Sequence, residues 1–434
     1  MSPITVGIIG IIFMLILFIL RMPIAFAMAF AGWLGYSYLT NFTAGTKLLI
    51  RDFFSIFSSY NLSVITTFIL MGTYAFASGI SQRLFKASYD IFGGLKGGLA
   101  ITTVAASAGF AAICGSTTAS AATIGKIAYP EMKRYRYNDT FSTGCIAASG
   151  TLGILIPPST VFIVYGILTE QSIGKLYAAG IVPGLIMASI FSIIIYILCQ
   201  IKPEWGPAGP PTNFLTKIKA LRMVWEGVVL FLVAIGGLFA GFFTPSQAGA
   251  VGAVGALVIG LLRRALTFRA FWDATIDGLR TACMILFLIA GATVFGHFMA
   301  ITRIPAALAD WIKGLEVSPL VIMTFITIIY LIGGCFIDAM PLIILTIPIF
   351  YPIVIDLGFD PIWFGVLIVI VSQVGVISPP VGVNAYVVKS IAPEVPLEQI
   401  FKGAVIIGIG MILTIFLIFL FPHLATWLPT YVKW

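Results

Sequence analysis

The stretches Gly153-Ile-Leu-Ile-Pro-Pro-Ser159 and Gly375-Val-Ile-Ser-Pro-Pro-Val-Gly-Val-Asn384 lie deep inside long apolar segments of this 434-residue chain. Proline removes a backbone amide donor and clashes with the preceding turn, so each Pro-Pro pair predicts a break in a helix. Within a bilayer, non-helical backbone is tolerated only where protein buries it or where it lines a wet cavity. A lone proline indicates only a kink, but a motif that breaks two membrane helices in the same way predicts a binding site.

The composition around these motifs is that of a polytopic membrane protein. Apolar residues make up 60% of the chain, charged residues only 9%, and the mean hydropathy is +1.10. Soluble domains carry about a quarter charged residues, whereas a helical membrane crossing needs about 20 apolar residues in a row. The apolar segments are too continuous for the alternating strands of a barrel, so we expect an all-helical fold. The net charge of +8 comes from Lys and Arg clustered in short loops and does not indicate nucleic-acid binding.

Two further apolar stretches are interrupted at their centres. Residues 98–129 contain Gly115-Ser-Thr-Thr-Ala-Ser120, and residues 319–351 contain Gly333-Gly-Cys-Phe-Ile-Asp-Ala-Met-Pro341. Such small polar and glycine-rich clusters compete with helical hydrogen bonding and tend to end helices. Both stretches therefore predict re-entrant helical hairpins.

The two halves of the chain repeat one plan. A shift of 222 residues (379 − 157) superimposes the Pro-Pro pairs, and the same shift places Tyr129-Pro130 on Tyr351-Pro352 and Gly153 on Gly375. Each copy is then a re-entrant hairpin followed by a discontinuous helix. Other spans are expected near 4–20, 23–39, 54–80, 176–201, 223–243, 247–262, 281–302 and 401–421, with a loop over 81–97 and a polar linker over 202–216.

The charges beside the hairpins predict that the copies are inverted, because Lys and Arg favour the cytoplasmic side. The first hairpin is flanked mainly by basic residues: Arg83, Lys86, Lys96, Lys133, Arg134 and Arg136. The second hairpin is flanked by two basic residues, Arg303 and Lys313, and by four acidic ones: Asp310, Glu316, Asp356 and Asp360. We expect the first hairpin to open from the cytoplasm, the second from outside, and both chain termini to lie outside.

The two breaks are candidate cation sites. Inverted repeats with broken helices typify secondary transporters, whose unwound carbonyls hold ions near the bilayer midplane. Each Pro-Pro pair frees carbonyl oxygens, and neighbouring hydroxyls add further hard oxygen ligands of the kind that suit sodium. The cation-binding residues expected on this basis are Ser116, Ser149, Gly150, Thr151, Pro157, Gly333, Gly334, Gly375, Ser378 and Pro379.

A carboxylate substrate is expected between the hairpin tips. The residues predicted to bind it are Ser116, Thr117, Thr118, Asp338 and Asn384. An acid at membrane depth such as Asp338 is a functional candidate by default. A helix cap at the hairpin tip explains Asp338 equally well, and single hydroxyls near the breaks equally serve helix packing.

The remaining charged residues carry no predicted chemistry. Glu226 lies near a span end, where we expect water to reach it, and His297 and His423 are isolated in the sequence. Paired carboxylates, His-rich metal spacing and a Ser/His dyad in facing spans are not found, so the sequence does not indicate an enzyme.

The quoted motifs resemble one known family over nearly the whole chain. Residues 115–125, Tyr129-Pro-Glu-Met132, residues 153–160, residues 334–341 and residues 375–384 look like the large membrane subunit of tripartite ATP-independent periplasmic (TRAP) transporters. The resemblance implies an elevator-type, sodium-coupled importer of organic acids in the bacterial inner membrane. It also implies two partners, a small four-helix membrane subunit, here expected as a separate polypeptide, and a soluble periplasmic substrate-binding protein.

The resemblance further implies a division of the chain into moving and static parts. The transport domain would comprise 82–172 and 303–393, and the scaffold would comprise 1–81, 173–302 with its cytoplasmic linker, and 394–434. Two other functions remain compatible with the residues. A stand-alone sodium- or proton-coupled anion transporter of related fold would need no binding protein, and a channel would conduct without stoichiometric ion coupling.

Overall fold

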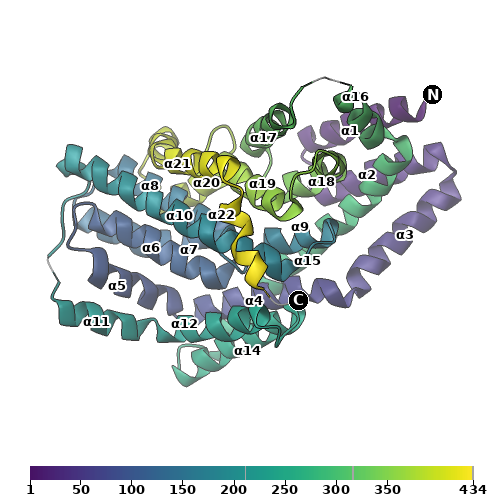
Figure 1. Ribbon diagram of the computed structural model, residues 1–434. Helices are drawn as coiled ribbons and strands as arrows, with labels where there is room; N and C mark the ends of the chain where they lie inside the picture. Colours follow the sequence, from purple (N-terminus) through teal and green to yellow (C-terminus); the bar gives the residue numbers. More distant parts are fainter. Residues whose placement is uncertain (211, 315–316, 433–434) are drawn as a thin grey trace.

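The computed structural model describes residues 1–210, 212–314 and 317–432 (Figure 1). Every regular element within these ranges is a helix, as the composition predicted. Seven helices of this described part are long and apolar enough to cross a membrane, or eight if the bent pair Phe214–Met223 and Trp225–Phe239 forms one span. Glu316, one of the acids in the charge argument, lies outside the described residues.

The first repeat contains the predicted hairpin and the predicted broken helix. Its hairpin turns at Gly115, which has a φ of 67°, in the left-handed region that glycine adopts without strain. A 3₁₀ turn and an irregular stretch separate the halves of the broken helix. The elements are α6 (Gly98–Cys114), α7 (Thr117–Arg134), α8 (Asp139–Gly150), a 3₁₀ turn (Thr151–Ile154) and α9 (Thr160–Leu168).

The second repeat has the same order of elements. Asp338 caps its second hairpin helix, and Gly382, with a φ of 47°, begins the second half of its broken helix. The elements are α17 (Pro319–Phe336), α18 (Ala339–Asp356), α19 (Pro361–Val376) and α20 (Val383–Ile391). Both discontinuous helices and both hairpins that the sequence predicted are therefore present.

Hydrogen bonds between the repeats establish their relative orientation. At the base of the first hairpin, the Tyr129 hydroxyl donates to Asp139 at the start of α8 (3.4 Å) and to Glu394 just beyond α20 (2.8 Å). At the base of the second hairpin, the Tyr351 hydroxyl donates to the carbonyl of Thr169 just beyond α9 (3.3 Å). The two bases thus lie at opposite ends of the broken helix α8–α9, so the hairpins enter from opposite sides and the repeats are inverted.

Helices outside the two repeats, here called the flanking helices, pack around this centre. The long helix α15 lies against α2 and α4, and α21 lies against α8 and α10 (Figure 1). The longer flanking helices are α1 (Pro3–Ile19), α2 (Ile24–Leu39), α3 (Phe42–Ser58), α4 (Ser63–Ala77), α10 (Ile173–Ile201), α14 (Pro245–Leu262), α15 (Phe268–Thr302) and α21 (Leu397–Leu420). Shorter ones are α12 (Trp225–Phe231), α13 (Gly237–Phe239), α16 (Ile304–Lys313) and α22 (His423–Thr426).

Several segments expected to be loops or single spans are separate helices. The expected span 54–80 is divided between α3 and α4, and the expected loop 81–97 contains α5 (Ile80–Phe92). The linker ends in α11 (Phe214–Met223), which runs beside α5 (Figure 1). Because these helices carry charged residues on one face, their sequences lack the continuous apolar run of a spanning helix.

Two expectations about charged residues were wrong. Glu226 is buried, with 3% of its side chain exposed, and forms ion pairs with Arg83 (2.9 Å) and Arg263. His297 is not isolated, because its Nδ1 lies 2.7 Å from Oδ2 of the buried Asp52 on α3. Both acids are paired with residues distant in sequence, as buried charges require.

Candidate functional site

The tip of the first hairpin rests on the first Pro-Pro break. A Cβ added to Gly115 would lie 2.5 Å from the carbonyl oxygen of Pro158, and one added to Gly153 would lie 2.4 Å from the carbonyl oxygen of Ser116. The Thr160 hydroxyl donates to the Gly115 carbonyl at 3.1 Å. Backbone can approach backbone this closely only where glycine replaces a side chain.

Hydroxyls predicted to bind a cation are buried at the same break. Ser149 Oγ donates to the Ile146 carbonyl (3.2 Å), and Thr151 Oγ1 donates to the Ala148 carbonyl (2.6 Å). Each hydroxyl gives its proton to the backbone, so its oxygen lone pairs remain available to a cation. Pro157, also at this break, is buried as well.

The tip of the second hairpin rests on the second broken helix. A Cβ added to Gly375 would lie 1.8 Å from the carbonyl carbon of Gly334, and the Val381 amide donates to the Cys335 carbonyl at 3.2 Å. Gly333 faces the Leu342 side chain of the opposite hairpin helix instead.

The rest of the second break is more open than the first. Ser378 Oγ donates to the Val374 carbonyl at 2.7 Å. Pro379 is exposed, whereas Pro157 in the first repeat is buried. The two sets of predicted cation residues therefore lie at two separate breaks with different exposure.

Asn384 links the two repeats. Its side-chain Nδ2 donates to the Ala147 carbonyl on α8 at 3.1 Å, and a Cβ added to Gly150 would lie 3.0 Å from the same nitrogen. Its Oδ1 is buried and accepts no hydrogen bond from the described residues. Asn384 thus lies beside the predicted cation residues of the first break.

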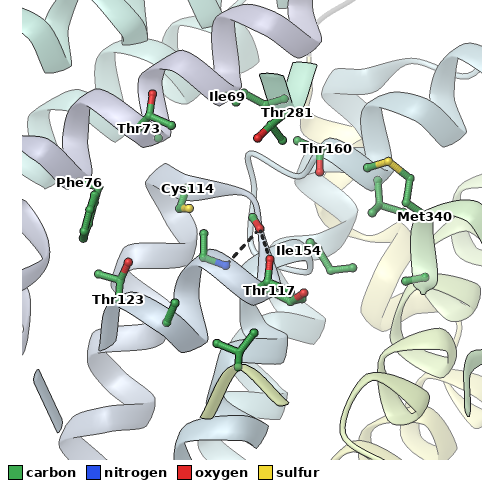
Figure 2. Close-up of a pocket in the computed structure, with 18 of the residues that line it drawn as sticks. Ile69, Thr73, Phe76, Cys114, Thr117, Thr123, Ile154, Thr160, Thr281 and Met340 are labelled. Atoms are coloured by element: carbon green, nitrogen blue, oxygen red, sulfur yellow. Dashed lines mark hydrogen bonds between the residues drawn. The ribbon is translucent and has the colours of Figure 1, made fainter. Parts of the chain in front are cut away.

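A cavity of about 600 Å³ lies between the hairpin tips and the flanking helices α4 and α15 (Figure 2). Figure 2 shows Thr73 and Thr281 on the side of the flanking helices, with Thr117 and Thr123 of the first hairpin facing them. The cavity also contains four of the residues predicted to bind substrate, which are Ser116, Thr117, Thr118 and Asp338. These residues meet although 220 positions separate the two hairpin tips (338 − 118).

The predicted substrate residues also serve as caps. Ser116 Oγ accepts from the Ala119 amide at 3.4 Å and lies 3.3 Å from Thr118 Oγ1. Asp338 Oδ1 accepts from the Ala339 amide at 2.9 Å, so the helix-cap interpretation of Asp338 is correct. One carboxylate oxygen is used for this cap, and the side chain is also part of the cavity wall.

Lys126 is a polar residue of the cavity wall that sequence reasoning missed, and Gln373, which stands near the second break in the sequence, also lines the wall. Lys126 lies on the α7 face that also presents Ala119, Ala122 and Thr123, at helical spacings of three and four from the hairpin tip. That periodicity was the available signal for Lys126. The sequence around Gln373 is apolar and does not indicate which face of its helix meets the cavity.

Ion pairing at the base of the first hairpin holds the end of α20. Lys133 and Glu394 form an ion pair, and Glu394 also accepts from Tyr129. The hydrogen bond from Lys133 is the main reason why the pKa of Glu394 falls to about 2. The acid therefore stays ionised at any pH near neutrality.

Two inverted repeats, each a hairpin whose tip closes on a broken helix beside one shared cavity, define a multi-pass membrane transport protein. Residues 11–424 match the family described as "Tripartite ATP-independent periplasmic transporter, DctM component". The chain belongs to this family, the large permease component of TRAP transporters, as its motifs indicated.

The names of individual relatives refer to different substrates. The chain is 36% identical to the C4-dicarboxylate TRAP transporter large permease protein DctM of Pseudomonas aeruginosa, over 85% of this chain and 84% of that protein. It is 29% identical to the sialic acid TRAP transporter large permease protein SiaM of Vibrio cholerae, over 94% of this chain and 95% of that protein. With the isethionate TRAP transporter permease protein DctMQ of Oleidesulfovibrio alaskensis it is 35% identical, over 84% of this chain and 57% of that protein.

A solved structure has the same fold. The YdaH transporter of Alcanivorax borkumensis aligns with a TM-score of 0.62, covering 90% of this chain and 89% of that one. At 14% identity this likeness concerns the fold alone.

Proposed function

We propose that this protein imports an organic acid across the bacterial inner membrane by sodium symport, with an elevator movement of the two repeats. The acid would be delivered by a periplasmic substrate-binding protein, and a small four-helix membrane subunit would complete the permease. The observation that carries the proposal is the cavity bounded by both hairpin tips, with Lys126 as a cationic side chain in its wall. The Lys126 side chain is exposed, so its ammonium group is free to donate a charge-assisted hydrogen bond to a carboxylate.

Sodium suits the oxygen-rich surroundings of the two breaks. Among the described residues, no group of three or more His, Cys, Asp or Glu could hold a metal ion. The hydroxyls of Ser149 and Thr151 and the backbone carbonyls of the breaks are instead neutral oxygen donors, which favour a hard monovalent cation. Binding of the cation would order the hairpin tips and so build the substrate site, and substrate and cation would each tighten the binding of the other by the same factor.

The walls of the cavity support an elevator movement. One wall consists of the hairpin tips and the broken helices, and the other of α4 and α15. In the proposed mechanism the moving body is 82–172 together with 303–393, and the other segments form the scaffold. Sliding of that body past α4 and α15 would carry the site from one side of the membrane to the other.

Reconstitution tests this function directly. The permease with its small subunit would be placed in liposomes and supplied with a candidate binding protein loaded with a radiolabelled organic acid. We expect uptake when the sodium gradient points inward, and its loss when potassium replaces sodium. Equal uptake without the binding protein would favour a stand-alone anion transporter, and sodium-independent flux would contradict symport.

A substitution in the cavity connects the transport assay to the structure. Lys126→Met removes the charge but keeps a long side chain, so we expect the KM for the acid to rise about tenfold or more, since charge-assisted hydrogen bonds contribute about 1.5–3 kcal/mol. Lys175→Met is the matched control, because Lys175 is an exposed residue at the start of α10. An unchanged KM in Lys126→Met would contradict the proposed position of the carboxylate.

A further inference from the structure

Gln373 is a buried polar residue of the cavity wall that has no partner. It lies near the end of α19, with 1% of its surface exposed. Its Oε1 and its Nε2 are both buried and make no hydrogen bond with the described residues. The adjacent Ser372 instead bonds within its own helix, to the Val369 carbonyl at 3.0 Å.

An amide in this condition is costly for the folded protein. A buried polar group left without a partner destabilises the folded state, and the Gln373 amide holds both an acceptor and donors. A core position at this depth would be filled at lower cost by Leu or Met. Gln373 is therefore placed to bind something that enters the cavity.

The chemistry of the amide limits what that ligand can be. A carboxylate only accepts hydrogen bonds, so it can pair with Nε2 but leaves Oε1 unsatisfied. A hydroxyl group both donates and accepts, so it can satisfy Oε1 directly and leave Nε2 for a neighbouring oxygen. The charged residues of the wall, Lys126 and Asp338, offer one cation and one carboxylate.

We propose that Gln373 is a specificity-determining residue that selects organic acids bearing a hydroxyl group, which donates to Oε1 while a neighbouring oxygen of the same molecule accepts from Nε2. This inference rests on the proposed import of an organic acid and deepens it. A site built to bind a hydroxyl rejects the analogue that lacks it, because the amide then stays buried and unpaired. The unhydroxylated dicarboxylates are accordingly poor ligands for this chain.

Paired probes test the proposal on the purified permease with its small subunit in lipid nanodiscs. The pairs differ by hydroxyl groups only: malate with succinate, glycerate with propionate, and gluconate with hexanoate. Dissociation constants would be measured by calorimetry in sodium and in potassium buffer. In at least one pair we expect the hydroxylated acid to bind about tenfold or more tightly than its partner in sodium, as expected for one buried unpaired group.

A substitution tests whether the Gln373 side chain causes the difference in affinity between the two acids of a pair. Gln373→Met keeps the volume but removes both hydrogen-bonding atoms, so we expect it to abolish the difference within a pair. Gln399→Met is the matched control, since Gln399 is exposed at the start of α21, and it should preserve the difference. Thermal unfolding confirms that each variant is folded, and if Gln373→Met does not fold, the wild-type pairs decide alone.

The outcomes separate the two proposals. Sodium-dependent binding that is equal within every pair, or a difference that persists in Gln373→Met, overturns the role of Gln373 and leaves the proposed function intact. Absence of binding by every acid in sodium, together with no sodium-driven uptake in the liposome assay, contradicts the proposed function itself, and the inference falls with it.

Discussion

At the scale of single residues, glycine decides whether the hairpin tips close. Gly334 and Gly375 bring α17 and α19 into backbone contact, and Gly115 and Gly153 do the same in the first repeat. Gly153 and Gly375 recur at a shift of 222, but the sequence did not reveal which glycines touch each other. That information depends on the register of two helices that are distant in the chain.

Gly375→Ala tests this contact. The added Cβ would lie 1.8 Å from a Gly334 backbone atom, so the tip of the second hairpin must move away from α19. Overpacking costs about 1–3 kcal/mol even where side chains can adjust, so we expect a clearly lower unfolding temperature and lost uptake. Gly296→Ala is the control, because its nearest neighbour would be 3.9 Å away. Wild-type stability in Gly375→Ala would contradict the close packing.

The pH dependence of stability depends on Glu394. Its pKa is lowered from the ordinary carboxylate value to about 2, chiefly by the hydrogen bond from Lys133. A lowered pKa stabilises the fold fully above the unfolded-state pKa, and this contribution disappears as the pH falls through the folded-state pKa. Glu394→Gln should therefore lower the unfolding temperature by the same amount from about pH 6 to pH 8, and by less below about pH 4. A difference that grows toward acid pH would contradict this assignment.

At the scale of helices, the sequence predicted the elements whose signals are local. Proline pairs and Gly-Ser-Thr clusters mark the breaks in α8–α9 and α19–α20 and the hairpin tips, because each acts on its own backbone. The sequence did not predict α3, α5 and α11 as separate helices. Each has charged residues on one face, so no continuous apolar run marks it. The ion pairs of Glu226 could not be predicted either, because Arg83 and Arg263 are 143 positions before and 37 positions after it in the chain (226 − 83, 263 − 226).

Glu226→Gln tests how α5, α12 and the α14–α15 connection are held together. Removal of the carboxylate leaves Arg83 facing Arg263 without a counter-charge. Breaking a fully buried pair costs about 3–5 kcal/mol, and because the side chain of Arg263 is 48% exposed we expect a smaller loss, about 2 kcal/mol. A thermal unfolding series with Arg83→Met and the double variant measures the coupling. Additive effects in the double variant would show that the pair contributes nothing.

At the scale of the whole molecule, the inverted arrangement predicts opposite labelling patterns. Arg134 lies at the base of the first hairpin and Lys175 just beyond α9, at the end of the broken helix where the second hairpin enters. In a variant without its native cysteines, Arg134→Cys should react with an impermeant maleimide only from the cytoplasmic side. Lys175→Cys should react only from outside. Labelling of both positions from one side would contradict the inversion.

The reciprocal hydrogen bonds at Tyr129 and Tyr351 have a mechanical consequence. Each tyrosine bonds its own copy of the duplicated unit to a residue just beyond the last helix of the other copy. The two copies are therefore tied together at both ends of the broken helix α8–α9. We expect a disturbance at one membrane surface to reach the opposite surface, about 30 Å away, through the two copies themselves.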